Sequence, residues 1–304
     1  MAHEACFFGD ESELVGRCVP FISEGLSSGQ PTAVCCTRDV CDTLRDALGP
    51  DAGRLSLVTA AEDLWRGGHE TFLAWNALTR EMGSRGGPWR LVAEPFWVGL
   101  PDGREWHRFE ATINHLYAET ACYKLCIHDR NRLPDQVLEE VKRTHPLLSD
   151  GSAPVPSRDY LDPAEFINRI QPAWTPAPAL AASDVPDNPR VARDFAADQL
   201  RRTGLAGRED DVMVVVDELV TNSFEAGGRP VITTWTAESQ FVIEVADEAG
   251  GGVTPLAGYI PPGTIHDSGR GLWLAWALSD DAALRSGPEG TAIRMYFGLA
   301  APRW

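Results

Sequence analysis

The sequence predicts an α/β protein with two domains, an N-terminal parallel sheet with helices on both faces and a C-terminal α/β sandwich. The chain has 304 residues, more than one hydrophobic core usually contains. All seven cysteines and six of the seven histidines precede residue 150, so the two halves differ in composition. The order of elements also differs, because strands alternate with helices in the first half whereas two helices precede the strands of the last third.

Short apolar runs alternate with amphipathic stretches in the first half. Apolar residues recur at helical spacing from Leu14 to Leu26, while the run Thr32 to Cys36 has the composition of a buried strand. We expect strands at 5–8, 32–36, 54–59, 89–94 and 122–127, and helices at 12–26, 39–48, 70–82, 104–118 and 134–144. This alternation is typical of a mostly parallel sheet covered by helices on both faces.

The amino-acid composition changes at residue 145. Residues 145–186 are rich in Pro, Ala and Ser, and we expect a loosely packed linker with a short helix at 162–170. Beyond it the expected order is helices at 188–203 and 209–226, strands at 229–235 and 240–247, a glycine- and proline-rich loop, a helix at 270–278, and strands at 282–286 and 291–297.

Charge and composition exclude several classes of function. The formal net charge of −17 repels phosphate backbones, which argues against nucleic-acid binding. No run of about 18 apolar residues predicts a membrane span, and the acidic N-terminus is unlike a secretory signal. An odd number of cysteines in such a chain indicates reduced thiols. We therefore expect a cytoplasmic protein that binds neither membrane nor nucleic acid.

The segment DELVTNSFEAGG, residues 217–228, is the first candidate for chemistry. Glu218 and Asn222 are four residues apart and therefore share one face of the predicted helix. The side-chain oxygen of Asn222 is a suitable Mg²⁺ ligand, and the carboxylate of Glu218 can accept a proton from an attacking hydroxyl. An ordinary polar helix face explains this segment equally well when it is taken alone.

Two further segments carry glycines beside possible ligand contacts. Asp247 ends a predicted strand just before a glycine run, where a carboxylate can accept a hydrogen bond from an exocyclic amine. In HDSGRGLWL, residues 266–274, Gly269 and Gly271 open a helix whose free N–H groups suit a phosphate. A simple turn and a helix start without a ligand are the alternatives. Thr291 is placed where its hydroxyl can face the same pocket.

In order and spacing these segments resemble the ATP-binding fold of gyrase, heat-shock chaperone, histidine kinase and mismatch-repair ATPases (GHKL), and most closely the anti-sigma-factor serine kinases. ELVTN at 218–222 and GRGLWL at 269–274 stand intact. The resemblance covers about residues 186–298 and implies Mg²⁺ and ATP as cofactors. The roles that it implies are a general base at Glu218, a Mg²⁺ ligand at Asn222, an adenine contact at Asp247, a lid and phosphate site at Gly251, Gly269, Arg270 and Gly271, and support of the adenine end at Thr291.

The same resemblance implies partners. It predicts a kinase that phosphorylates a serine or threonine of a STAS-type antagonist and sequesters a sigma factor, with a homodimer as the expected assembly. Two positions depart from the family pattern, Ala249 where the first glycine is expected and Glu225 or Ala226 where His or Arg is usual. These departures keep open a non-catalytic module that uses nucleotide only for partner switching. His69 lacks the context of a phosphoacceptor histidine.

The first half resembles the sensory domain of methanogen and methylotroph regulators (MEDS). The matching segments are HEACFF at 3–8, PFISEGLSSGQPTAV at 20–34, WRLVAEPFW at 89–97, FEATINHL at 109–116, CIHDRNRLP at 126–134 and THPLL at 144–148. The resemblance implies a RecA-like or KaiC-like core. It divides the chain into a sensory domain at 1–165, a linker at 166–185 and an ATPase domain at 186–304.

Histidine and cysteine residues of the first half form a candidate sensory site. Residues at strand ends of a parallel sheet gather on one edge, so we expect convergence of the following side chains: His3, Cys6, Cys126, His128 and His145. These residues could form a metal site, a thiol-redox site or a site for an unidentified small ligand. The alternative interpretation is that the cysteines are buried and purely structural. Arg90, Glu94 and Glu110 are the alternative polar pocket. GLSSGQPT, residues 25–32, lacks the lysine of a phosphate loop.

Overall fold

The computed structural model describes residues 1–64, 68–95, 104–150, 153–203, 207–237, 239–249, 251–260 and 270–298. Two compact units divide the chain, Met1–Phe166 and Ile167–Trp304. Gly269 lies outside the described residues, as do the residues 261–268 that precede it. No helix within the described ranges is both long enough and apolar enough to cross a membrane.

The N-terminal unit is built on a seven-stranded sheet with the order β3-β2-β4-β5-β1-β6-β7. Its strands are β1 (Ala2–Phe8), β2 (Thr32–Cys36), β3 (Leu57–Ala60), β4 (Trp89–Ala93), β5 (Cys122–Asp129), β6 (Leu147–Ser149) and β7 (Val155–Pro156). Every pairing is parallel except β6 with β7, which is antiparallel. The predicted parallel sheet is therefore confirmed.

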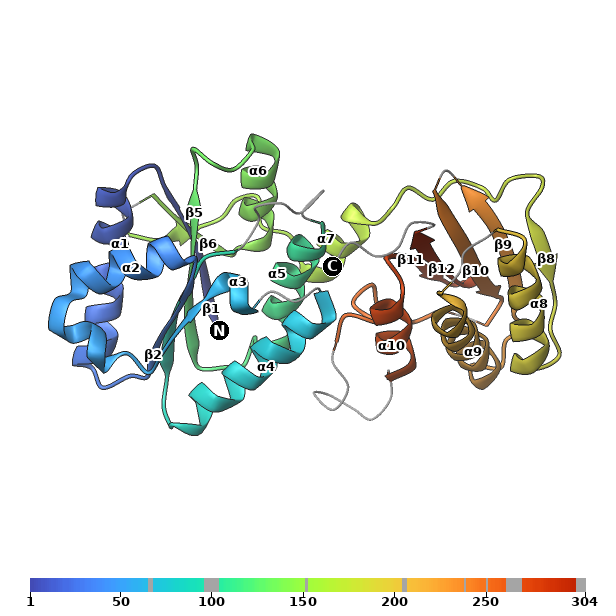
Figure 1. Ribbon diagram of the computed structural model, residues 1–304, viewed down its shortest axis with the longest axis horizontal. Helices are drawn as coiled ribbons and strands as arrows, with labels where there is room; N and C mark the ends of the chain where they lie inside the picture. Colours follow the sequence, from blue (N-terminus) through green and yellow to red (C-terminus); the bar gives the residue numbers. More distant parts are fainter. Residues whose placement is uncertain are drawn as a thin grey trace. The chain divides into compact units, whose positions relative to one another are not determined.

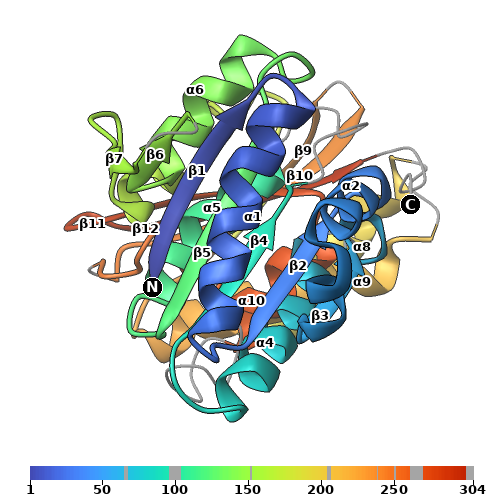
Figure 2. The same cartoon turned by 90° about the vertical axis from the view of Figure 1, so that its left-hand side faces the viewer.

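Helices cover both faces of this sheet. Helices α1 (Glu11–Ser27) and α2 (Arg38–Leu48) lie on one face, and α4 (Gly68–Ser84), α5 (Arg104–Leu116) and α6 (Asp135–Thr144) lie on the other (Figures 1 and 2). Short helical turns η1 (Gly49–Arg54) and α3 (Ala61–Leu64) complete the connections, and α7 (Pro163–Ile170) follows β7. The side chain of Asp10 accepts a hydrogen bond from the Glu13 amide and so fixes where α1 begins.

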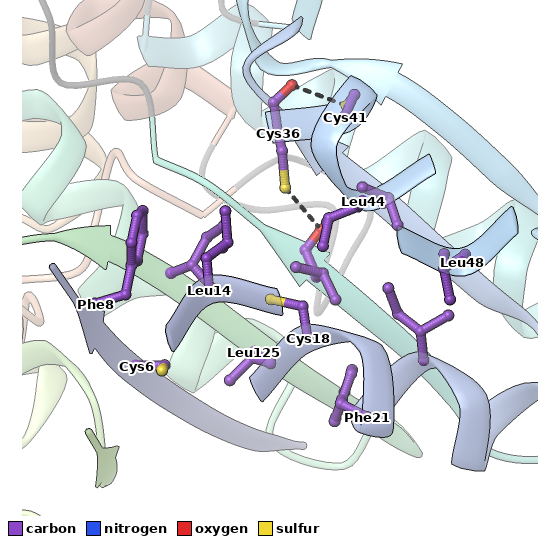
Figure 3. Close-up of a cluster of buried hydrophobic side chains, with 14 of the residues drawn as sticks. Cys6, Phe8, Leu14, Cys18, Phe21, Cys36, Cys41, Leu44, Leu48 and Leu125 are labelled. Atoms are coloured by element: carbon purple, nitrogen blue, oxygen red, sulfur yellow. Dashed lines mark hydrogen bonds between the residues drawn. The ribbon is translucent and has the colours of Figure 1, made fainter. Parts of the chain in front are cut away.

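The two faces of β1 and β5 are chemically different. Even-numbered residues of β1 point toward α1 and α2, where Cys6 and Phe8 join an apolar cluster with Leu14, Cys18 and Leu125 (Figure 3). Odd-numbered residues of β1 point toward α5, and His3 is fully buried there. Because successive side chains of a strand alternate between faces, residues an odd number of positions apart cannot share a site on one face.

The C-terminal unit is a five-stranded antiparallel sheet with helices on one face. The strand order is β11-β12-β10-β9-β8, formed by β8 (Ala182–Asp184), β9 (Val231–Ala237), β10 (Gln240–Asp247), β11 (Asp281–Gly287) and β12 (Gly290–Gly298). The helices are α8 (Pro189–Arg201), α9 (Glu209–Glu225) and α10 (Arg270–Leu278) (Figure 1). The predicted α/β sandwich is confirmed, and the apolar residues of α9 form its core: Val212, Val215, Val216, Leu219 and Val220.

The expectation of a loosely packed linker at 145–186 is wrong in part. Strand β6 pairs with β1, and β8 pairs with β9, so this stretch contributes strands to both sheets. Residues 171–175, at the start of the second unit, pack against its sheet, since Gln171 Oε1 accepts a hydrogen bond from the Leu284 amide. Proline and small residues indicated flexibility, but the hydrogen bonds and ring contacts of this stretch hold it in place.

Arg294 is the main attachment of this segment. It is buried on β12 and donates to Glu244 Oε2 at 2.5 Å and to the Thr175 carbonyl at 2.6 Å. Its guanidinium also lies 4.0 Å from the ring centroid of Trp174 and 5.0 Å from that of Trp235. The Arg294 side chain therefore links β12, the adjacent strand β10 and residues 171–175.

We predict that Arg294→Ala lowers the free energy of unfolding of the C-terminal unit by about 2–3 kcal/mol, because Glu244 and the Thr175 carbonyl lose their donor. Urea unfolding measures the loss, and hydrogen exchange should show faster exchange at 171–175. Arg285→Ala is the matched control. Arg285 is exposed and also lies over Trp174, at 4.6 Å, so its removal should change stability by less than about 1 kcal/mol. Equal effects of the two variants would contradict this account.

Candidate functional site

Helix α9 presents a carboxylate and an amide to the first turn of α10. Glu218 and Asn222 are both half-buried and lie one helical turn apart. A Cβ built on Gly271 would overlap Glu218 Oε2 and would lie 3.6 Å from Asn222 Nδ2. The backbone of α10 therefore lies against the carboxylate end of Glu218 and in van der Waals reach of Asn222.

Asp247 lies at the end of β10, beside the last turns of α9. A Cβ on Gly228 would lie 2.9 Å from the Asp247 side chain and 3.0 Å from Ser223 Oγ. Since Ser223 directly follows Asn222, the Asp247 carboxylate on β10 lies near the end of α9 that carries the Glu218–Asn222 pair. Asp247 Oδ1 accepts a hydrogen bond of 2.9 Å from the Ala249 amide, which leaves its second oxygen for a ligand.

A hydroxyl pair supports Asp247 from the neighbouring strands. Thr291 is the register partner of Asp247 on β12, and its Oγ1 lies 3.1 Å from Ser286 Oγ. Ser286 Oγ accepts from the amides of Gly252 and Val253, each at 3.2 Å. The hydroxyls thus fix the start of the glycine-rich loop. Sequence patterns did not indicate Ser286, because a serine before a strand turn is common.

Gly251 has a structural reason to be glycine. Its amide donates to the Gly287 carbonyl at 2.9 Å, and a Cβ at this position would overlap the Gly287 backbone. Arg270 is exposed as the first residue of α10, and Glu225 and Ala226 are exposed at the end of α9. The described residues therefore bring Glu218, Asn222, Asp247, Gly271 and the hydroxyl pair to one end of the sandwich, whereas Gly269 lies outside the described chain.

The arrangement suits a nucleotide with its cation. Free N–H groups at the start of α10 and its positive dipole end favour an anionic phosphate. The oxygen of Asn222 is a hard ligand for Mg²⁺, and Glu218 lies within one turn of it. Asp247 can accept a hydrogen bond from an amine at the other end of the same ligand.

Four buried side chains of the N-terminal unit converge on the α5 face of the sheet. Ligand atoms of His3, Glu110, Cys126 and His145 all lie within 4.8 Å of one another. Nε2 of His3 lies 3.3 Å from Cys126 Sγ and 3.1 Å from Glu110 Oε2. The side chains come from β1, α5, β5 and the residue after α6, so three of the five predicted sensory residues meet here.

The other predicted sensory residues lie elsewhere. Cys6 is three positions from His3 on β1 and therefore faces the opposite, apolar side of the sheet, so its inclusion in the set was wrong. The His128 ring meets that of His145 edge to face, with centroids 5.4 Å apart, but His128 does not belong to the four-residue group.

The alternative polar pocket does not form as expected either. Glu94 accepts hydrogen bonds from the amide and hydroxyl of Thr37, at the start of α2. Arg90 donates to Gln30 and Glu24 on the α1 side. Glu110, which we had placed in that pocket, instead joins His3, Cys126 and His145.

Comparisons with known proteins agree with this division. Residues 2–146 match the family described as MEDS, the methanogen/methylotroph DcmR sensory domain, and residues 182–297 match the histidine kinase-like ATPase domain. The chain therefore combines a sensory domain of the MEDS type with a histidine kinase-like ATPase domain. No curated protein is similar enough to be matched.

Among solved structures, one similar chain is that of the RsbU and RsbW domains of Rv1364c from Mycobacterium tuberculosis. It is 22% identical, with a TM-score of 0.31, and the match covers 41% of this chain and 34% of that one. The matched region thus spans about a third of that protein.

The contact between α9 and α10 gives a stability prediction. Gly271→Ala should change the free energy of unfolding of the C-terminal unit by less than about 1 kcal/mol, because the new methyl group meets only the flexible carboxylate end of Glu218, which can turn away, and alanine favours a helix. Thermal unfolding followed by calorimetry measures the change. Gly287→Ala is the control, since a Cβ there meets nothing within 4 Å. A loss of several kcal/mol for Gly271→Ala alone would show that Glu218 cannot turn away from α10.

Proposed function

We propose that the C-terminal domain binds Mg²⁺–ATP and phosphorylates a serine or threonine of a STAS-type antagonist protein, and that it sequesters a sigma factor when the antagonist is absent. The N-terminal domain would regulate this activity in response to a signal. The observation that carries the proposal is the convergence of Glu218 and Asn222 with the first turn of α10 at Gly271. The intact ELVTN and GRGLWL segments, which resemble those of anti-sigma-factor kinases, supply the substrate class.

Each residue has a role in this scheme that follows from its position. Bound Mg²⁺ would neutralise charge that develops on the transferred phosphoryl group. Asn222 offers its side-chain oxygen to that cation, and the amides at the start of α10 hold the phosphates. Glu218 accepts the proton of the attacking hydroxyl from the partner. Asp247, fixed by the Ala249 amide and backed by Thr291, accepts a hydrogen bond from the adenine amine.

A non-catalytic binding module is the second candidate. Ala249 stands where anti-sigma kinases carry glycine, and its methyl group adjoins the predicted adenine contact. Weak nucleotide binding without phosphotransfer would then leave partner switching as the function. The exposed Glu225 lowers the positive potential available for phosphate at that end of α9.

Nucleotide binding to the full chain tests the site. We expect calorimetry to detect Mg²⁺–ATP binding in the micromolar range, and we expect both Asn222→Ala and Asp247→Asn to abolish it. Asp210→Asn is the control, because Asp210 is an exposed acid on the same helix and its loss should leave affinity unchanged. Absence of binding by the unmodified chain would reject the ATP site.

Phosphotransfer separates the two candidate functions. With radiolabelled ATP and purified STAS-domain proteins from the same organism, the unmodified chain should label one of them on serine or threonine. Glu218→Gln should reduce that rate at least about 100-fold, since it removes the general base, while calorimetry still detects ATP binding. If ATP binds but no STAS protein is labelled, the partner-switching module is the better account. Unchanged transfer by Glu218→Gln would exclude Glu218 as the base.

A further inference from the structure

We propose that His3, Glu110, Cys126 and His145 form a binding site for one divalent metal ion of the zinc class in the N-terminal domain. All of its residues belong to the N-terminal domain, so the proposal does not rest on the proposed nucleotide site. Its four donors are the nitrogen, oxygen and sulfur ligands that Zn²⁺ accepts in tetrahedral coordination. All four side chains are almost completely buried.

The separations between donor atoms fit such a site. Tetrahedral Zn²⁺ with its usual bond lengths places ligand atoms about 3.3–3.8 Å apart. The observed separations are 3.1 Å from His3 Nε2 to Glu110 Oε2, 3.3 Å from His3 Nε2 to Cys126 Sγ, and 3.7 Å from His145 Nε2 to Glu110 Oε2. Small movements of side chains would complete the geometry without rearranging the backbone.

Both histidines are oriented as metal ligands usually are. His3 Nδ1 lies 2.9 Å from Asn114 Oδ1, and Asn114 Nδ2 donates to the carbonyls of Glu110 and Thr144, which fixes the amide so that its oxygen faces His3. His145 Nδ1 lies 2.9 Å from the Val141 carbonyl. In each ring the proton therefore sits on Nδ1, and the lone pair of Nε2 points to the centre of the cluster.

This tautomer leaves lone pairs facing one another. Nε2 of His3 and of His145 both meet the Glu110 carboxylate, and His145 Nε2 has no hydrogen-bond partner within the described part of the chain. A divalent cation at the centre would bind the three acceptors that otherwise repel one another, namely the two Nε2 atoms and the Glu110 carboxylate.

Lys124 supplies the outer contact of the carboxylate. Its Nζ lies 3.2 Å from Glu110 Oε1 and 3.0 Å from Glu110 Oε2. This buried ion pair favours the ionised carboxylate. The carboxylate is thus already an anion. Burial raises the pKa of the Cys126 thiol, so metal binding must release its proton and form the thiolate.

A thiol-redox site accounts less well for the same residues. None of the described cysteines forms a disulfide, and Cys6, on the neighbouring strand, points to the other face of the sheet. A buried thiol with a raised pKa is a poor nucleophile. The two histidines with oriented Nδ1 atoms serve no purpose in a disulfide switch, whereas a metal site uses both.

Metal content and cobalt spectra of the full chain test the site. We expect the purified protein to hold close to one equivalent of Zn²⁺, and the Co²⁺ form to show tetrahedral visible bands with a thiolate-to-cobalt charge-transfer band. Cys126→Ser should remove the charge-transfer band and most of the zinc. Cys6→Ser, a buried thiol three residues from His3 on the opposite face, should keep both.

A second variant probes the orientation of His3. Asn114→Ala removes the acceptor of His3 Nδ1 without removing a ligand, and should weaken Zn²⁺ affinity about 10–100-fold in a competition titration with a chelator. His115→Asn, which replaces an exposed histidine at the end of α5, should not change it. The proposal is overturned if the unmodified chain neither holds zinc nor gives the charge-transfer band with Co²⁺, or if Cys6→Ser loses the metal as completely as Cys126→Ser.

Discussion

The close approach of α10 to α9 at Gly271 is the constraint on which the C-terminal site depends. Without a side chain at this position, the first amides of α10 lie against Glu218 and Asn222. The apolar side of α9 is packed into the core. The polar side chains of the same helix therefore point away from the core, and Glu218 and Asn222 face α10. The first turn of α10, an amide and a carboxylate therefore meet where the two helices touch, and we propose that this is where phosphate and Mg²⁺ bind.

A second close approach extends the site toward β10. Gly228 lets the chain after α9 pass beside Asp247 and Ser223, and Thr291 pairs with Asp247 from the adjacent strand. The glycine-rich loop then begins from a fixed point, because Ser286 accepts two of its amides. Helix α9 thus carries Glu218 and Asn222, which we propose for the phosphate end of the nucleotide. Strands β10 and β12 carry Asp247 and Thr291, which we propose for the adenine end.

The two faces of the N-terminal sheet carry different kinds of side chain. One face of β1 and β5 packs cysteines and aromatic or aliphatic side chains beside the buried Glu4–Arg17 ion pair, and the other buries histidines, a glutamate and a lysine. Burying so many polar groups is unfavourable unless they bind one another or a ligand. The polar face therefore distinguishes this domain from a purely structural one, whereas the cysteines of the apolar face need no function beyond packing.

Sequence periodicity predicted most elements within a few residues, including β2, β10 and α10 with their observed bounds. It missed β6 and β8, since strands of three residues are too short to show alternation. It placed Cys6 in the sensory set because strand-end clustering was considered without the alternation of faces. Glu110 was assigned to another pocket, since the register that brings α5 over β1 and β5 depends on contacts distant in sequence. Motif spacing indicated Glu218, Asn222 and Asp247, but not Ser223, Gly228 or Ser286, whose roles arise from packing.

Hydrogen–deuterium exchange of the full chain with and without saturating Mg²⁺–ATP tests the central claim most directly. The account predicts slower exchange in three segments together, the end of α9 from Glu218, the turn after Asp247 and the first turn of α10 from Arg270. Asn222→Ala should abolish all three effects. Unchanged exchange in these segments at saturating nucleotide, or protection confined to other parts of the chain, would contradict it.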